Sequence, residues 1–323
     1  GILLLLLIII SFRLGRYPVN TKELVGILAS NFFRIEKFWP EQMETVLYNI
    51  RLPRIALACL VGCCLSVAGA SYQGVFQNPM AAPDILGASS GAAFGAALAI
   101  LNYGSSREIT LSAFFFSLLT VAIVNFISKR ARGKNILGLV LSGIMVSSLF
   151  SAGTSFIKLV ADPNDQLPAI TYWLMGSLSG TKKEDVFFVI LPMTMGLIPL
   201  FLIRWRMNVL TLGDDEAKTM GVNANQIRLI VIICSTLITA ASVSVSGMIG
   251  WVGLVIPHLS RKLVGNNYKH LIPASMLFGA IFLLLVDNVS RNLLTTEIPL
   301  GILTAFIGAP FFLYLITRRG ESY

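Results

Sequence analysis

The sequence predicts an all-α, polytopic membrane protein of about ten transmembrane helices. Hydrophobic residues make up 55% of the 323 residues and charged residues only 13%, whereas a soluble domain has about 25% charged residues. The apolar residues also form long runs, such as 1–10 and 186–203, and a helix needs about 20 apolar residues to cross a bilayer. These observations exclude a soluble enzyme, a disordered chain and a disulfide scaffold.

Ten apolar segments are the predicted spans. They cover residues 1–14, 54–74, 84–102, 109–128, 136–160, 185–203, 226–246, 250–264, 270–291 and 299–317. The first is interpreted as the surviving part of a transmembrane helix, because no small-residue signal cleavage site follows it. The eighth is short and carries Pro257 and Arg261, so we expect it to be half-buried. The polar segments between spans are too small for a separate domain, so residues 1–323 form one transmembrane domain.

Basic residues predict how the spans are oriented. Lys and Arg gather in the cytoplasmic loops of membrane proteins. Four basic groups fall on one side of a ten-span protein, at residues 129–134, 204–228, 261–269 and 318–319. That side is therefore predicted to be cytoplasmic. The segment 15–53 is an exception, because it is predicted to lie outside and yet carries five basic residues.

Small residues predict close helix contacts. Gly87, Gly91 and Gly95 recur at every fourth position, a spacing that lets two helix backbones approach closely. Plain packing is the favoured interpretation, and the alternative is that this small face lines a wide pore. The four cysteines all lie within apolar segments and are interpreted as small hydrophobic residues packed between helices.

The sequence has no motif that supports ATP hydrolysis, metal or cofactor binding, nucleic-acid binding or ion-driven transport by this chain. There is no phosphate-binding loop of the form G-x-x-x-x-G-K-[ST], so this chain is not itself an ATPase of that type. No metal or cofactor motif occurs, and structural roles are favoured for His258 and His270. The net charge of +9 could suggest nucleic acid, but no basic stretch is interleaved with aromatic residues, so membrane lipid is the expected partner. No pair of carboxylates lies deep in a predicted helix, which counts against an ion-driven carrier.

A polar stretch at about 212–222 predicts a short cytoplasmic helix. Its marks are Gly213, Asp214, Asp215, Glu216, Ala217, Met220 and Gly221. The acidic residues would open the helix, where the helix dipole favours negative charge, and the last glycine suits the position after its end. Ala217 and Met220 are expected to share one face. Because so short a helix is marginal alone, it must pack on its own bundle or dock on a cytoplasmic partner.

Six motifs together resemble the FecCD-like permease subunits of type II ABC importers for iron chelates, haem and vitamin B12. They lie at 50–54, 77–87, 172–176, 212–221, 250–261, and 297–301 with 308–310, and the resemblance covers almost the whole chain. It implies a homodimer, or a pair with a close homologue, around a central pathway. It also implies two cytoplasmic ABC ATPase subunits that hold ATP and Mg, an extracytoplasmic substrate-binding protein, and the cytoplasmic (inner) membrane of a bacterium or archaeon.

The resemblance also implies roles for particular residues. The outer arginines would bind carboxylates of the binding protein, and these are Arg51, Arg54 and Arg291. This role would explain the basic outer segment, and the alternative is that Arg51 and Arg54 anchor a helix among lipid headgroups. The 212–222 helix would couple the bundle to the ATPase. The gate and pathway would involve Asn78, Pro79, Met80, Ser89, Ser90 and Ser142, with Ser147 and Ser148, in a wall without fixed charge.

The function favoured by these observations is the permease subunit of an ATP-driven importer for a metal chelate, a transport subunit rather than an enzyme. Iron–siderophore is the first expectation for the cargo, followed by haem and cobalamin. A molybdate or tungstate importer of the same family remains open. Outside the family, the alternatives are an ion-coupled secondary carrier and a membrane scaffold or respiratory-complex subunit. Only the importer requires a P-loop ATPase to copurify with this chain.

Overall fold

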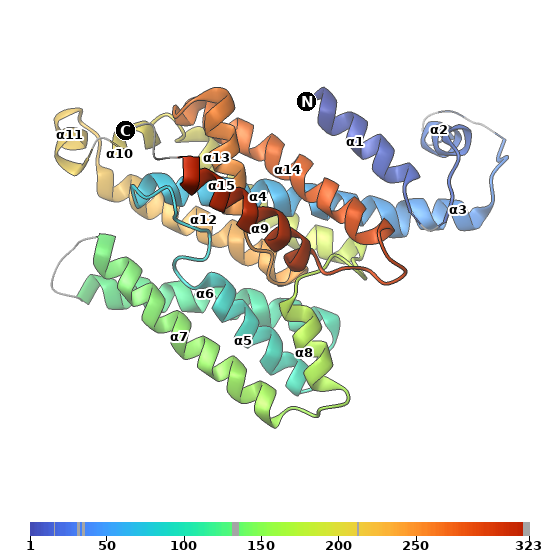
Figure 1. Cartoon of the computed structure of the whole chain (residues 1–323), viewed down its shortest axis with the longest axis horizontal. Helices are drawn as coiled ribbons and strands as arrows, with labels where there is room; N and C mark the ends of the chain where they lie inside the picture. The colour runs from blue at the N-terminus through green and yellow to red at the C-terminus, as the bar shows by residue number, and fades with distance from the viewer. Residues whose placement is uncertain (16, 31–32, 34–35, 131–135, 212, 319–323) are drawn as a thin grey trace.

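The computed structural model describes residues 1–15, 17–30, 33, 36–130, 136–211 and 213–318 (Figure 1). Every regular element within these ranges is a helix, which confirms the all-α prediction. Parts of the predicted basic groups lie outside the described residues, namely Arg132, Lys134 and Arg319, and so does Leu212 at the start of the predicted coupling segment.

Each of the ten predicted spans contains a helix, and six helical segments in the described chain are long and apolar enough to cross a membrane. These six are Glu41–Val75, α6 (Ser106–Arg130), α7 (Ile136–Val160), α9 (Lys183–Leu202), α12 (Ala224–Ser246) and α14 (Tyr268–Asn292). The others are α1 (Ile2–Arg13), α5 (Ala88–Leu101), α13 (Val252–Val264) and α15 (Leu300–Arg318), whose described apolar part is Leu300–Tyr314. The chain is therefore a multi-pass membrane protein, and the count of ten spans stays a prediction.

The segment Glu41–Val75 is longer than a bilayer is thick. It joins α3 (Glu41–Thr45), the π-helix η1 (Val46–Arg51) and α4 (Leu52–Val75). The 24 residues of α4 alone extend about 36 Å at 1.5 Å per residue, against a hydrocarbon core of about 30 Å. Because α4 alone is long enough to cross it, we expect the first two pieces to project beyond the membrane. Four shorter helices complete the fold: α2 (Thr21–Ser30), α8 (Gln166–Leu174), α10 (Met207–Leu210) and α11 (Asp214–Thr219).

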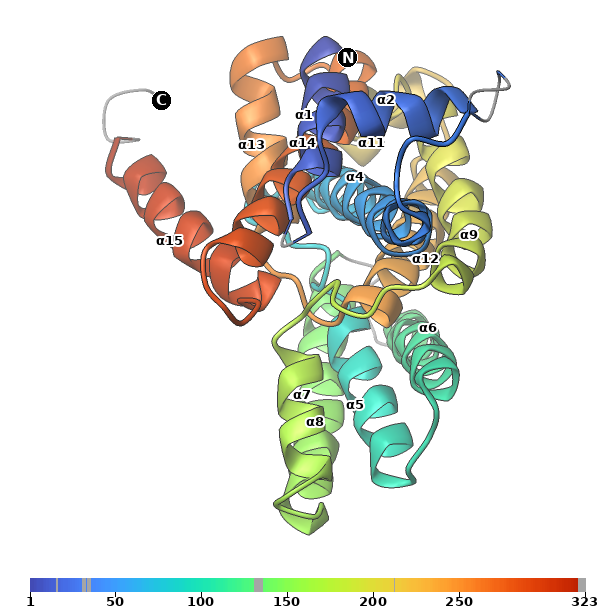
Figure 2. The ribbon, with the colours of Figure 1, turned by 90° about the vertical axis from the view of Figure 1, so that its right-hand side faces the viewer.

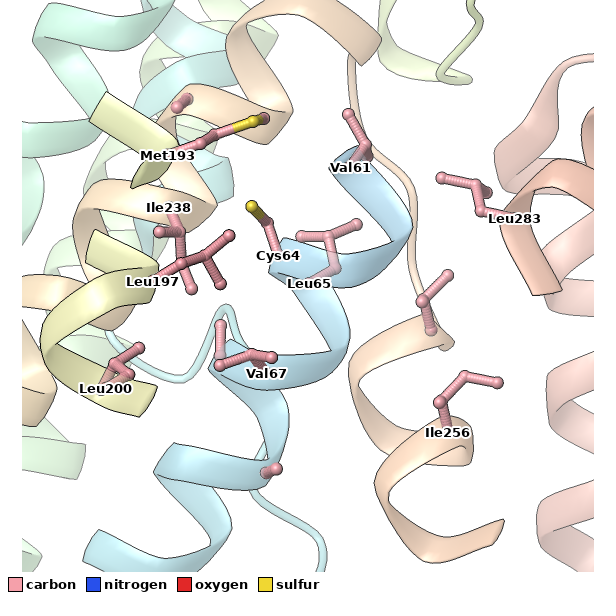
Figure 3. Close-up of a cluster of buried hydrophobic side chains, with 14 of the residues drawn as sticks. Val61, Cys64, Leu65, Val67, Met193, Leu197, Leu200, Ile238, Ile256 and Leu283 are labelled. Atoms are coloured by element: carbon pink, nitrogen blue, oxygen red, sulfur yellow. The ribbon is translucent and has the colours of Figure 1, made fainter. Parts of the chain in front are cut away.

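Helix α4 is the buried axis of the molecule. In Figure 3 its side chains Val61, Cys64, Leu65 and Val67 lie between Met193, Leu197 and Leu200 of α9, with Ile238 of α12, on one side and Ile256 and Leu283 on the other. Cys64 is fully buried among these apolar groups, which confirms its interpretation as a small hydrophobic residue. The most apolar stretch of Glu41–Val75 is 78% buried, against 22% for α7, so α7 presents most of its surface to lipid or to another chain.

The helices form two layers. Helices α5 to α8 lie below the others in Figures 1 and 2, and α15 stands apart at one side in Figure 2. The glycine stripe belongs to the lower layer. A Cβ atom at Gly95 would lie 2.5 Å from the carbonyl oxygen of Ser112, and one at Gly91 would lie 2.5 Å from that of Phe116, both on α6. The packing interpretation of the stripe is therefore confirmed.

The predicted basic groups gather at one end of the molecule. Figure 1 shows the ends of α6 and α15 together with α10 and α11 at the left, and η1 and the start of α4 at the right. The turn between α13 and α14 joins the left end, because the Asn208 side chain next to α11 donates to Asn267 Oδ1 at 3.0 Å. The left end is therefore the predicted cytoplasmic end, and the right end is called the outer end below.

Candidate functional site

Five charged side chains meet at the outer end, where α4 begins and α14 ends. The Arg54 Nε group donates to Asp287 Oδ1 at 2.9 Å. Its Nη1 and Nη2 atoms donate to the two carboxylate oxygens of Glu297 at 2.8 and 2.9 Å, a bidentate geometry that makes a strong, directional pair. Arg291 Nε lies 3.1 Å from Asp287 Oδ2. Arg51, Arg54, Asp287, Arg291 and Glu297 are called the outer charge cluster.

The outer charge cluster is largely inside the protein. Asp287 is 0% exposed and the Arg54 side chain 7%, whereas the Glu297 side chain is 25% exposed. Arg51 is also buried, and it donates to the carbonyl oxygens of Phe12, in the last turn of α1, and of Tyr17, beyond the end of α1. With three guanidinium groups and two carboxylates, the cluster carries a formal charge of +1.

The sequence predicted that the three arginines act together, and the structure brings them together. It also differs from the expectation in one respect, because these arginines are buried and internally bonded and are not outward-facing surface charges. The carboxylate partners Asp287 and Glu297 were missed. They lie 233 and 243 positions from Arg54 in the chain, so no local spacing could have linked them.

A small cavity adjoins the outer charge cluster. It has a volume of about 220 Å³ and is lined by Arg51, Arg54, Arg291 and Glu297, with Tyr17 and Ile50 among the other lining residues. A single positive charge in excess beside an open space favours an additional negative group. The geometry can therefore accept one carboxylate from outside the chain, with Glu297 as the existing partner that is nearest to solvent.

The predicted cytoplasmic helix exists as α11, with bounds close to the prediction. Gly213 precedes it with φ +117°, and Gly221 follows it with φ +72°. The Val222 amide donates to the Ala217 carbonyl at 2.9 Å, the bond that closes a helix end with a left-handed residue. The backbone of Asp214 and Asp215 forms the first turn of α11, while their side chains lie outside the described residues.

Ala217 and Met220, which were expected to share one face, differ strongly in exposure. Ala217 is 0% exposed and belongs to the main core, whereas Met220 is 59% exposed. Met220 follows the last residue of α11, and its amide still donates to the Glu216 carbonyl at 3.2 Å. Helix α11 therefore packs on its own bundle through Ala217 and presents Met220 to the surroundings.

The predicted gate residues form a tight, exposed turn directly after α4. Asn78 Oδ1 accepts from the Met80 amide at 2.9 Å, and the Asn78 carbonyl accepts from the Ala81 amide at 3.0 Å. Pro79 lies between them and restricts the backbone of the preceding residue to extended conformations. Residues 78–80 are called the gate loop below. Because these bonds hold the loop together, its orientation depends on the backbone angles of the residue before Asn78.

An open groove of about 680 Å³ runs along α7 and contains part of the predicted pathway. It is lined by Asp84, Ile85, Val140, Ile144, Ser147, Ser148 and Ser151. Ser142 is buried, and its hydroxyl donates to the Gly138 carbonyl at 2.8 Å in its own helix. Ser89 and Ser90 are half-buried at the start of α5. Only Ser147 and Ser148 of the predicted serines therefore line this groove.

Asp84 is the residue that sequence reasoning missed in this groove. The span predicted at 84–102 begins only at Ala88, so Asp84 lies in the connection before α5. Its carboxylate accepts from the Ser89 amide at 2.6 Å, and burial raises the pKa of this carboxyl to about 6. The groove thus contains a titratable acid, whereas a wall without fixed charge was expected.

The chain matches a known protein family and several curated proteins over most of its length. The profile of the FecCD transport family matches residues 3–318. The chain is 42% identical over 327 residues to the molybdate import system permease protein MolB of Haemophilus influenzae, covering 100% of this chain and 96% of the relative. It is also 42% identical over 276 residues to a probable iron chelatin transport system permease protein of Helicobacter pylori, covering 85% and 83%.

A solved structure shows the same architecture. It is described as an inward-facing conformation of a candidate metal-chelate type ABC transporter, and it is 40% identical to this chain. The two superpose with a TM-score of 0.88, covering 98% of this chain and 97% of that one.

Proposed function

Because the chain belongs to the FecCD transport family, we propose that it is the permease subunit of an ATP-driven importer and forms its translocation pathway. The family match over residues 3–318 is the observation that carries this proposal. ABC permeases are transport subunits, so ATP and Mg would be held by two partner ATPase subunits. The permease itself would pair with a second copy or a close homologue in the cytoplasmic membrane of a bacterium or archaeon.

We propose a metal chelate, first an iron–siderophore complex and then haem or cobalamin, as the cargo. Relatives named for molybdate and for iron chelatin are equally identical to this chain at 42%, so identity alone does not rank the two classes. The groove along α7 supports the chelate. Its seven lining residues include a carboxyl and three hydroxyls but no basic side chain, so a dianion such as molybdate would find no positive partner there.

The outer charge cluster would receive the substrate-binding protein. A carboxylate of that protein would enter the cavity beside Arg51, Arg54 and Arg291 and neutralise the excess positive charge. Because Arg54 is already paired with Glu297, docking would require the incoming carboxylate to share or displace Glu297. Complementary charge of this kind steers encounter and fixes the register of a complex more than it adds affinity.

Helix α11 would couple the bundle to the ATPase. It is anchored to the core through Ala217, while Met220 faces outward. An exposed apolar side chain on a short, anchored helix fits a cleft on a partner, and rigid anchoring would carry the partner's movement into the bundle.

Purification from native membranes tests the proposed function. The expected result is that a P-loop ATPase copurifies at one subunit per permease chain and hydrolyses ATP. Reconstitution with the binding protein would then compare uptake of a ferric siderophore, haem, cobalamin and molybdate. A chain that purifies alone and transports down an ion gradient would show that it is a secondary carrier.

A further inference from the structure

Gln77 has an unusual backbone conformation at the end of α4. Its amide donates to the Gly74 carbonyl at 3.3 Å, and the Asn78 amide donates to the Gln73 carbonyl at 3.2 Å. These two bonds define a Schellman ending, whose left-handed residue is usually glycine. Here that residue is Gln77, with φ +49°. A side chain at such a position costs conformational energy, so the presence of glutamine calls for a compensating interaction.

The Gln77 side chain makes that interaction with the cytoplasmic segment. Its Nε2 atom donates to the carbonyl oxygen of Leu210 at 2.8 Å, across 133 positions of sequence. Leu210 is the last residue of α10, and carbonyls at a helix end have no partner within their own helix. Gln77, the residue directly before the gate loop, is therefore bonded to the end of α10.

Helix α10 is itself firmly held. Met207 and Leu210 are at most 1% exposed. Asn208 accepts from the Tyr268 amide at 2.8 Å through Oδ1, in addition to its bond to Asn267. Only three residues separate α10 from α11. A displacement of α11 would therefore have only a short connection to cross before it reached Leu210.

We propose that Gln77 is the positioning residue that transmits movement of α10 and α11 to the gate loop. The proposal rests on the coupling role of α11 and the gate role of residues 78–80 in the proposed function. When α11 moves, the Leu210 carbonyl moves with it, and Gln77 follows through its side chain. Because Gln77 is held in the left-handed region, a change in its backbone angles redirects Asn78. Pro79 restricts Asn78 to extended conformations, so the reorientation passes on to Met80.

The chain supplies a matched control for the conformational cost. Tyr103 ends α5 with the same pattern, since its amide donates to the Ile100 carbonyl at 3.0 Å and the Gly104 amide donates to the Ala99 carbonyl at 2.9 Å. Its φ is +54° and its side chain is 72% exposed. Glycine at either position removes the same conformational cost, but only Gln77→Gly also removes a bond to α10. Gln77→Glu keeps the length of the side chain and loses the donor.

The experiment uses the complete complex of permease and ATPase subunits in nanodiscs, with Met80→Cys spin-labelled in a background free of native cysteines. The distance between the two labels of a permease pair is measured without nucleotide and with trapped ADP–vanadate, beside ATP hydrolysis and the melting temperature. We expect Tyr103→Gly to melt at a higher temperature, and Gln77→Gly to gain less, because it also loses the bond to Leu210. Gln77→Gly and Gln77→Glu should lower the ratio of shifted to unshifted label pairs in the trapped state by about five-fold, the equivalent of a net hydrogen bond of about 1 kcal/mol. Tyr103→Gly should keep the full shift.

Three results would overturn the proposal. The first is a full label shift in Gln77→Gly, which would make the side-chain bond irrelevant to transmission. The second is loss of the ATPase subunits from both Gln77 variants, which would make Gln77 a structural cap. The third is a parent complex that hydrolyses ATP without moving the label, which would remove the gate role of the loop. Failure of the parent permease to retain any ATPase would instead refute the proposed function itself.

Discussion

Asp287 should be the residue on which the stability of the outer end depends most strongly. Its carboxylate is 0% exposed and is shared by Arg54 at 2.9 Å and Arg291 at 3.1 Å. Asp287→Leu removes one of two negative charges, so the formal charge of the cluster rises from +1 to +2. Removal of one partner from a buried ion pair costs about 3–5 kcal/mol, and we expect a loss of unfolding free energy in this range.

A second variant separates charge imbalance from a loss of packing. Asp287→Leu combined with Arg291→Met restores the formal charge of +1 and leaves the Arg54–Glu297 pair in place, and apolar replacement of a whole buried pair is often nearly neutral. The double variant should therefore recover most of the loss. Lys37→Gln is the exposed control, because it breaks a 2.9 Å ion pair with Glu44 whose lysine side chain is 58% exposed.

The unfolding free energies would be measured by titrating the purified chain in mixed micelles with sodium dodecyl sulfate and following its circular dichroism. Lys37→Gln should change little, since exposed pairs contribute little to stability. The reasoning fails if Asp287→Leu is no more destabilising than Lys37→Gln. It also fails if the double variant is as unstable as the single one.

Three further predictions concern the other sites. Met220→Asp should leave the melting temperature unchanged, because this side chain is 59% exposed. The same variant should uncouple ATP hydrolysis from transport. Unaltered ATPase binding and transport would contradict the coupling role. Glu297→Gln raises the formal charge of the outer cluster to +2, so surface plasmon resonance should show tighter docking of the binding protein at about 0.01 M salt than for the parent. The two should not differ at about 1 M salt, because the Debye length falls from about 30 Å to about 3 Å between these concentrations. An effect independent of salt would argue against docking by charge. Asp84 has a folded-state pKa of about 6, raised by burial from 3.8, so its neutral form is the one that the fold favours. Stability should therefore fall as the pH rises from about 4 to about 6 and then level off, and thermal melts of Asp84→Asn should lack this component.

The hydrophobic runs predicted the long helices well and the interrupted ones less well. The bounds of α7 agree with the predicted 136–160 at both ends, because a continuous apolar run has clear limits. The span predicted from residue 84 begins at Ala88, after Gly87 at φ +79°, because Asp84 caps the helix from outside it. Helices α2 and α8 were missed because they are short and lie in segments whose composition resembles a loop.

The two ends of the candidate site differed in how far they could be predicted. The signals for α11 are local, since Gly213 and Gly221 and the acidic residues between them fall within a few positions of one another. The partners of Arg54 are not local, since only the packing of α14 beside α4 brings Asp287 within reach. The sequence therefore predicted the three arginines and the short helix α11, but it could not predict that Arg54 and Arg291 are already paired inside the chain.

Helix α4 connects the two ends, because Arg54 lies in its first turn and Gln77 follows its last. It meets α14 and α13 at glycines, where a Cβ on Gly62 would lie within 2.8 Å of the Gly279 carbonyl carbon and one on Gly69 within 2.6 Å of that of Gly253. Close-packed helices of this kind cannot slide past one another without opening the core, so we expect the three to move together. Docking at the outer cluster would then reach the lower layer through the connection between α4 and α5. Through the bond between Gln77 and Leu210, movement of the ATPase would reach the same connection. Control of the pathway would therefore lie at residues 77–87, where both inputs meet, and α7 would respond to that connection without being driven directly.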